Sequence, residues 1–301
     1  MTRVFVTGAS GNVGRCALAE LVHRDHEVVA LVRNVVPGVE GVRPVFGSLS
    51  TIHAIASEVA RAEAIIHAAS PRTDDRKSAM AEDVAGTGWL IDAWSGGTFV
   101  FTSSQTIYGI PSGPLTEDSP TSAESWYDLA KICNEAQLAI AVRERGGGVG
   151  VSLRLPLLFA SGPRRRDRQF LPPVVNALSR GEKFFFRSEQ ALEESGSVYI
   201  GEEDLGRAIA DSLTIAKAGP YNLCGGFCTW RELLETLGRH TGRAPRLAIH
   251  PEPALSGEYR LPQSRSFFNT SKFSRATKFL PRQSLDEVIA RFVRAEGLSS
   301  L

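Results

Sequence analysis

Short runs rich in β-branched residues alternate with amphipathic stretches over residues 1–155, and this alternation restricts the possible folds more than any other feature. We interpret six of these runs as strands: RVFVTG, EVVALV, RPVFG, AIIHAA, TFVFTS and GVSLRL. The apolar spacing between them predicts helices near residues 13–24, 51–61, 79–95 and 127–145. Strands that alternate with helices form a parallel sheet covered on both faces. We therefore expect a doubly wound α/β domain, a Rossmann fold, over residues 1–155.

The pattern loosens after residue 155. The segment PLLFASGPRRRDR is rich in proline and arginine and is typical of a loop. A helix, the strand GSVYIG, a helix from Glu203 and a series of short elements follow. We expect residues 156–301 to form mainly a smaller substrate-binding lobe, with segments near 197–216 returning to the first domain.

Charge and composition exclude several classes of partner. The net charge is +1, and no basic stripe alternates with aromatic residues as nucleic-acid grooves require. No run approaches the roughly 20 apolar residues of a membrane span, and the first residues are too short an apolar run for a secretory signal. We expect a cytoplasmic protein. No His accompanies the four cysteines at zinc-ligand spacing, so we expect reduced, structural thiols and no metal: Cys16, Cys133, Cys224 and Cys228.

The stretch VTGASGNVG follows the first predicted strand and opens the first predicted helix. Small residues at such a turn let the backbone approach a pyrophosphate, and the helix N-terminus supplies amides and a favourable dipole. The alternative is a tight turn without a ligand. The candidate cofactor contacts in this turn are Gly8, Ser10, Gly11, Asn12, Val13 and Gly14.

The end of the second predicted strand, in ALVRN, occupies the position that reads the adenosine ribose in a dinucleotide fold. An acidic residue there would accept hydrogen bonds from a ribose 2′-hydroxyl and repel a 2′-phosphate. Arg33 instead offers a forked cation that suits a phosphate. The sequence thus predicts NADP(H), with NAD(H) less favoured. The alternative for Arg33 is an exposed charge at a strand end.

Two further stretches carry groups suited to acid–base chemistry. VFTSSQTIYG ends the fifth predicted strand, so Ser103 and Ser104 would face the same crevice as the glycine turn, unless they only satisfy a turn. In YDLAK, Tyr127 and Lys131 stand four residues apart and share one helix face. A free phenol titrates near pH 10, and a neighbouring ammonium favours the phenolate. Such a pair can exchange a proton with a substrate oxygen, although the same spacing also occurs in helices where it only packs.

Four motifs in this order resemble those of the extended short-chain dehydrogenase/reductase family, also called the epimerase/dehydratase family: TGASGNVG, HAAS at 67–70, TSSQTIYG and YDLAK. The later segments YIGEEDLGRAIADSL, GPYNLCGG and NTSKFSRATKFLP are similar to the second half of that family, so the resemblance covers nearly the whole chain. It implies a nicotinamide cofactor and a homodimer.

The resemblance also implies residue roles. Tyr127 would be the proton donor or acceptor at the substrate oxygen, with Lys131 as its partner and as a contact of the nicotinamide ribose. Ser104 would orient the substrate oxygen, and His67 would pack beside the cofactor without taking part in catalysis. The further cofactor contacts would be Ala68, Ala69 and Pro156.

Departures from the family's motifs limit the reactions that the chain could catalyse. Sugar-nucleotide dehydratases usually carry an Asp-Glu pair where this chain has Gln105 and Thr106, so dehydration would lack its acid and base. Epimerases usually have an Asn and an Arg that hold the diphosphate, where this chain has Leu157 and Ser197.

The roles of three other features stay open. The arginines that could bind an anion, or form a solvated loop, are Arg164, Arg165, Arg166 and Arg168. Ser48 and Leu49 replace a frequent adenine-binding Asp, and Tyr108 either lines the cleft or belongs to the core.

The function that we predict is an NADP(H)-dependent oxidoreductase, which moves a hydride between the nicotinamide and a carbonyl or alcohol carbon. Its substrate would be a small or medium-sized organic molecule, and whether that molecule is anionic stays open. Two alternatives stay open: a nucleotide-sugar epimerase with tightly held NAD(P), and a regulator that senses the dinucleotide without turnover. The presence of Ser104, Tyr127 and Lys131 together argues against the regulator.

Overall fold

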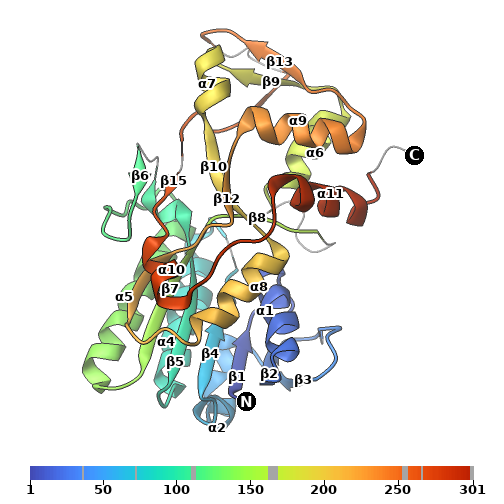
Figure 1. The fold of residues 1–301 in the computed structure, drawn as a ribbon. Coiled ribbons are helices and arrows are strands. Elements are labelled where there is room, and N and C mark those ends of the chain that lie inside the picture. The colour runs from blue at the N-terminus through green and yellow to red at the C-terminus, as the bar shows by residue number, and fades with distance from the viewer. Residues whose placement is uncertain are drawn as a thin grey trace.

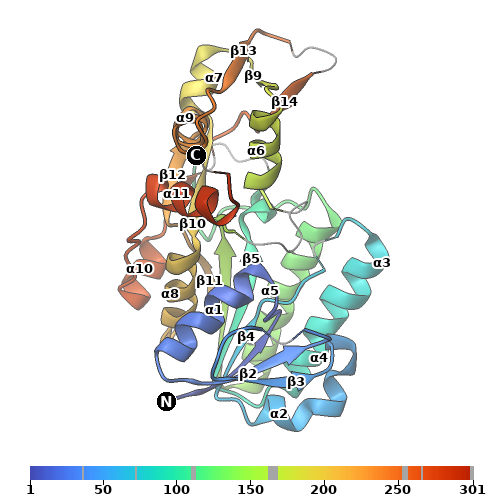
Figure 2. The same ribbon diagram turned by 90° about the vertical axis from the view of Figure 1, so that its right-hand side faces the viewer.

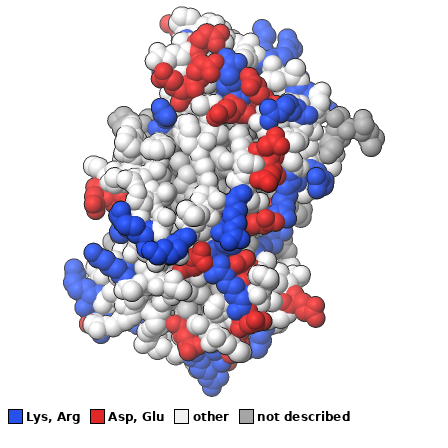
Figure 3. All heavy atoms as spheres, viewed as in Figure 1, with Lys and Arg blue, Asp and Glu red and all other residues white. Residues whose placement is uncertain are grey.

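The computed structural model describes residues 1–35, 37–71, 73–109, 113–161, 169–252, 257–265 and 267–298. Figure 1 shows a large sheet with its helices in the lower part of the molecule and a smaller lobe above it. On the face drawn in Figure 3, basic and acidic side chains are interspersed, and an uncharged area lies around the middle of the view.

The large sheet has seven strands, all parallel, in the order β11-β7-β5-β4-β1-β2-β3. Their bounds are β1 (Arg3–Thr7), β2 (Glu27–Val32), β3 (Val42–Phe46), β4 (Ala64–His67), β5 (Thr98–Ser104), β7 (Val149–Leu155) and β11 (Gly219–Asn222). The predicted doubly wound parallel sheet is therefore confirmed. Its first strand lies inside the sheet, because the chain adds β2 and β3 on one side and then continues with β4 on the other.

Helices cover both faces of this sheet, as Figure 2 shows. One face carries α1 (Asn12–His23) and α8 (Glu202–Ser212). The opposite face carries the 3₁₀ helix η1 (Leu49–Ile55), α2 (Ala56–Ala60), α3 (Arg76–Ser78), the π-helical turn η2 (Ala79–Val84), α4 (Ala85–Ala93) and α5 (Trp126–Arg145). The side chains of β1 alternate between the two cores, with Val4 and Val6 packing toward α1 and Phe5 packing toward α4.

The smaller lobe contains two three-stranded sheets. One has the order β12-β10-β8, from β8 (Leu157–Phe159), β10 (Gly196–Gly201) and β12 (Gly226–Thr229). The other has the order β13-β9-β14, from β9 (Lys183–Phe186), β13 (Arg246–Ile249) and β14 (Glu258–Arg260). Four helices pack around them: α6 (Leu171–Ser179), α7 (Glu189–Glu194), α9 (Trp230–Thr241) and α11 (Leu285–Ala295).

Segments from the second half of the chain also build the large domain. The strand β11 extends the large sheet beside β7, and α8 packs on α1 so closely that a Cβ added at Gly206 would lie 2.5 Å from the Cys16 carbonyl oxygen. The helix α10 (Ser271–Thr277) packs against β11. The short strands β6 (Pro114–Leu115) and β15 (Phe267–Phe268) pair next to the 3₁₀ turn η3 (Gln105–Tyr108). The two lobes are therefore interwoven by at least two crossings of the chain.

Buried polar contacts fix α5 against the sheet. Arg154 on β7 donates to both carboxylate oxygens of Glu135 on α5, at 3.1 and 2.8 Å. Asn134, also on α5, donates to Asp83 of η2 at 2.8 Å. The helix begins at the N-cap Ser125, whose hydroxyl accepts from the Asp128 backbone amide. These contacts determine which face of α5 is turned toward the ends of β5 and β7.

The structure also bears on the reactivity of the cysteines and on membrane insertion. All four cysteines are free, and burial raises the pKa of the Cys16 and Cys224 thiols to about 12, which makes them poor nucleophiles and poor metal ligands. In the described part of the chain, no helix combines the length and the apolar character that a bilayer crossing requires.

The pair formed by Arg154 and Glu135 gives a first testable prediction. Glu135→Gln leaves a buried guanidinium without its countercharge, so we expect the free energy of unfolding to fall by about 3 kcal/mol. The matched change Glu144→Gln, on an exposed turn of the same helix, should change it by less than about 0.5 kcal/mol. Urea denaturation followed by circular dichroism measures both. Equal stability of the two variants would contradict the anchoring role of the pair.

Candidate active site

A crevice opens at the carboxyl ends of the parallel strands, where the chain connections on either side of β1 and β4 diverge. Such a switch point is where open α/β sheets bind ligands. Two hollows occupy it, with volumes of about 560 and 260 Å³, which we call the larger and the smaller hollow. Both are lined by Gly11, Ala68 and Ser70, so they form one continuous cleft.

The glycine turn forms the floor of this cleft. Gly8 has a φ of 69°, and a Cβ there would lie 2.4 Å from the carbonyl carbon of Ala68. A Cβ at Gly14 would lie 2.2 Å from the Gly8 carbonyl oxygen, so Gly14 serves the packing of α1 on the turn and is not among the residues that line either hollow. Gly11 is the N-cap of α1 and no side chain caps it, which leaves the helix N-terminus open to a ligand.

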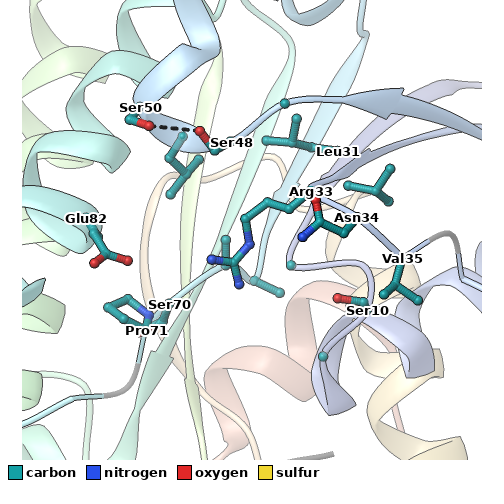
Figure 4. Close-up of a pocket in the computed structure, with 17 residues that line it drawn as sticks. Ser10, Leu31, Arg33, Asn34, Val35, Ser48, Ser50, Ser70, Pro71 and Glu82 are labelled. Atoms are coloured by element: carbon teal, nitrogen blue, oxygen red, sulfur yellow. Dashed lines mark hydrogen bonds between the residues drawn. The ribbon is translucent and has the colours of Figure 1, made fainter.

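Arg33 belongs to the larger hollow. Figure 4 shows its side chain extending from the end of β2 into the hollow, whose far wall carries Ser70, Pro71 and Glu82. Asn34 lies near the base of Arg33, and Ser10 lines the same space. The two residues that replace the usual adenine-binding Asp also lie here: Ser48, which contacts Ser50 at 2.8 Å, and Leu49.

The smaller hollow brings together Ser104, Tyr127 and Lys131 from the ends of β5 and α5. Lys131 is only 2% exposed, and its Nζ lies 4.8 Å from the Phe101 ring centroid and 5.4 Å from that of Tyr127. Ser104 is buried and caps η3 by accepting from the Thr106 amide at 3.2 Å. The same hollow is lined by Asn12, Val13, Pro156 and Leu157. Ser104 thus faces the same space as Tyr127 and Lys131, which follow it by 23 and 27 positions in the sequence.

The residues of the cleft fit a nicotinamide dinucleotide. A side chain at Gly8 or Gly14 would fill the turn with atoms, whereas glycine leaves the backbone accessible. The Ser103 hydroxyl, which lines the smaller hollow, is buried and has no hydrogen-bond partner among the described residues. Buried hydroxyls are rarely left unpaired, so this oxygen suits a polar group of a bound ligand.

His67 lies behind the cleft and not in it. Its Nδ1 is 2.6 Å from the Thr7 hydroxyl and its Nε2 is 2.8 Å from the Thr87 hydroxyl. Burial lowers its pKa to about 3, so the ring is neutral at physiological pH. Thr7 in turn accepts from the Ala69 amide at 3.2 Å. His67 therefore supports the turn after β4 that forms part of the cofactor cleft.

Several residues singled out in the sequence lie away from the reacting groups. Tyr108 is buried, with its ring edge-on to Phe268, and Arg154 donates to its hydroxyl at 2.7 Å, so it belongs to the core. Ser197 is buried at the start of β10, beside the side chain of Gln105. The anion-binding cluster that we considered lies outside the described residues: Arg164, Arg165, Arg166 and Arg168.

Sequence reasoning missed two buried carboxylates at this site. Asp83 accepts from Ser70 at 2.5 Å and from Asn134, which ties the wall of the cleft to α5. Asp128, directly after Tyr127, is 4% exposed and accepts from the hydroxyls of Thr106 and Ser125. An acidic residue in the first turn of a helix is common, because it interacts favourably with the helix dipole, so nothing in YDLAK marks Asp128 as unusual.

Solved structures share this fold over their whole length. The UDP-glucose-4-epimerase of Stenotrophomonas maltophila, solved with NAD and formylated UDP-arabinopyranose, is 20% identical, with a TM-score of 0.82 and 99% of each chain covered. MoeE5 in complex with UDP-glucose and NAD is 21% identical, with a TM-score of 0.80 and 98% of each chain covered. At such identities, the likeness shows the fold alone.

A curated relative and a family match extend the comparison. The sterol-4-alpha-carboxylate 3-dehydrogenase, decarboxylating, of Dictyostelium discoideum is 26% identical over 179 residues, which cover 54% of this chain and 55% of that protein. The chain thus matches about half the length of this relative. Residues 4–198, which contain the glycine turn, the end of β5 and all of α5, match the family described as NAD dependent epimerase/dehydratase. The chain therefore belongs to the NAD dependent epimerase/dehydratase family.

Proposed function

We propose that the protein is an NADP(H)-dependent oxidoreductase that reduces a carbonyl group, or oxidises the corresponding alcohol, on a small or medium-sized organic substrate. The observation that carries this proposal is the convergence of Ser104, Tyr127 and Lys131 in the smaller hollow, beside the glycine turn. Membership of a nicotinamide-dependent family supports the cofactor class.

Each of these three residues has a distinct role in the proposed reaction. When bound, the nicotinamide exchanges a hydride with the substrate carbon. Tyr127 gives a proton to the substrate oxygen during reduction and takes it back during oxidation. The buried ammonium of Lys131 would stabilise negative charge that develops on the Tyr127 oxygen during the reaction and would hold the nicotinamide ribose. Ser104 orients the substrate oxygen toward Tyr127.

The described wall of the smaller hollow favours a small organic substrate over a nucleotide diphosphate. Its lining includes the apolar residues Leu155, Pro156, Leu157, Leu158 and Phe170. Among the described residues that line it, Lys131 is the only charged one, and we assign that residue to the cofactor. Among the described residues, a diphosphate held here would therefore meet no cation besides Lys131, although polar residues such as Asn12 also line the hollow.

A second candidate is a nucleotide-sugar epimerase, in which one carbon is oxidised and then reduced while the cofactor stays in place. It is favoured by the shared fold with enzymes solved with UDP-glucose or a UDP-pentose. The two candidates differ in whether the cofactor is consumed.

The preference for NADP(H) rests on Arg33, whereas the solved structures named above contain NAD. We expect NADPH to bind at least about tenfold more tightly than NADH, because Arg33 would pair with the 2′-phosphate. Arg33→Asp should remove or reverse that preference. Arg187→Asp, the same charge change at an exposed site in the smaller lobe, should leave it intact. Isothermal titration calorimetry that gives equal or tighter NADH binding to the unmodified protein would contradict the assignment.

The roles of Tyr127 and Lys131 can be separated by substitution. Tyr127→Phe removes only the hydroxyl, so folding and cofactor affinity should be retained while turnover falls by about 10²-fold or more. Lys131→Met keeps the bulk of the side chain and should lower both turnover and cofactor affinity. Tyr259→Phe, in β14, is the control for loss of a phenol remote from the cleft. Full activity of Tyr127→Phe would show that the pair only packs.

Cofactor consumption distinguishes the two reaction classes. We expect the purified protein to bind NADPH reversibly and to consume it stoichiometrically with a carbonyl compound, followed as loss of nicotinamide absorbance. The epimerase would instead interconvert UDP- or dTDP-sugars, detected by chromatography, with no net change in that absorbance. Interconversion of such sugars together with inert carbonyl compounds would establish the second candidate in place of the first.

A further inference from the structure

The carboxylate of Asp128 determines where the proton of the Thr106 hydroxyl points. One of its oxygens, Oδ1, accepts from Thr106 Oγ1 at 2.5 Å, and the other, Oδ2, accepts from Ser125 Oγ at 2.7 Å. A carboxylate has acceptor oxygens only, so the hydroxyl proton in the first contact belongs to Thr106. Capping of α5 uses Ser125 and Oδ2, so the contact with Thr106 is not part of the helix cap.

The direction of this contact fixes the next one. Thr106 Oγ1 lies 2.9 Å from Ser104 Oγ. A hydroxyl has a single proton, and that of Thr106 points to Asp128, so Ser104 must donate in this pair. Ser104 Oγ also accepts the Thr106 backbone amide at 3.2 Å. One lone pair of Ser104, and no proton, is then left for the smaller hollow that this side chain lines.

We propose that Asp128 is a positioning residue which, through Thr106, turns the Ser104 proton away from the cleft, so that Ser104 offers an acceptor to the ligand. A ligand hydroxyl matches this acceptor because it can donate to it, whereas a carbonyl oxygen can only accept. The resting site therefore favours the alcohol form of its substrate. The hydrogen-bond order stands independently, and only this preference between alcohol and carbonyl rests on the proposed function.

Asp128→Asn should reverse which group donates in the hydrogen bonds that join Asp128, Thr106 and Ser104. Because Ser125 still donates, the Asn oxygen turns to Ser125 and the amide Nδ2 donates to Thr106. Thr106 then donates to Ser104, and the Ser104 proton points into the cleft. Asp92→Asn, on the exposed side of α4, makes the same chemical change away from the site and serves as the control.

Neutron diffraction of deuterium-exchanged crystals tests the hydrogen-bond order without a substrate. We expect the Ser104 deuteron to lie between Ser104 Oγ and Thr106 Oγ1 in the unmodified protein, and to point into the cleft in Asp128→Asn. A Ser104 deuteron that already points into the cleft of the unmodified protein overturns the proposal, whatever reaction the protein catalyses.

Ligand affinity tests the consequence. The probes are acetophenone bound with NADP⁺ and 1-phenylethanol bound with NADPH, two complexes that cannot react, measured by calorimetry. Asp128→Asn should raise the affinity for the ketone relative to the alcohol by about tenfold, the value of one hydrogen bond. In a Thr106→Val background, the same substitution should leave the ratio unchanged, because Asp128 acts through Thr106. An equal shift in that background would show that Asp128 acts by another route and would overturn the proposed relay.

Absence of turnover with every carbonyl compound, together with the expected deuteron positions, would refute the oxidoreductase and leave the relay standing. Turnover of a carbonyl compound, together with deuterons in other positions, would refute the relay and leave the oxidoreductase standing.

Discussion

The divergence of the chain on either side of β1 and β4 is the constraint on which the rest of the structure depends. All seven strands of the large sheet are parallel, so their carboxyl ends share one edge, and the crossovers leave that edge open only where they turn to opposite faces. The glycine turn, the turn after β4 and the end of β5 all meet there. Close backbone contact at Gly8 and Gly14 is what allows α1 to begin at the edge of the crevice.

Polar contacts in the buried interior then fix the positions of the proposed acid–base residues. Tyr127 and Lys131 sit on α5, and their direction depends on how that helix is rotated against the sheet. Three polar contacts set the rotation: those of Asn134 with Asp83, of Glu135 with Arg154 and of Asp128 with Thr106. Each joins α5 to a different element, namely η2, β7 and η3. A buried charge without its partner is costly, so these pairs define one orientation of the helix. The positions of the acid–base residues therefore depend on these contacts between α5 and its neighbouring elements.

The sequence predicted the fold and the three proposed acid–base residues, because periodicity and short motifs are local signals. The alternation over residues 1–155 identified six strands of the large sheet, and YDLAK and TSSQTIYG marked Tyr127 and Ser104. The seventh strand, β11, was not identified as part of this sheet, because it is short and comes after a separate lobe. The predicted helix near 79–95 is a π-helical turn followed by α4, preceded by α3. The contacts of Asp83 and of Asp128 with other elements were also missed, since they join residues 51 and 22 positions apart and carry no pattern in the chain.

The central claim is that one continuous cleft places a nicotinamide beside Ser104 and Tyr127 and a 2′-phosphate beside Arg33. A crystal structure of the protein with NADP⁺ tests it most directly. The account predicts the nicotinamide ring in the smaller hollow, its ribose within hydrogen-bond distance of Lys131, and the 2′-phosphate within hydrogen-bond distance of the Arg33 guanidinium. A nicotinamide outside the smaller hollow, or a 2′-phosphate that contacts only solvent, would contradict it.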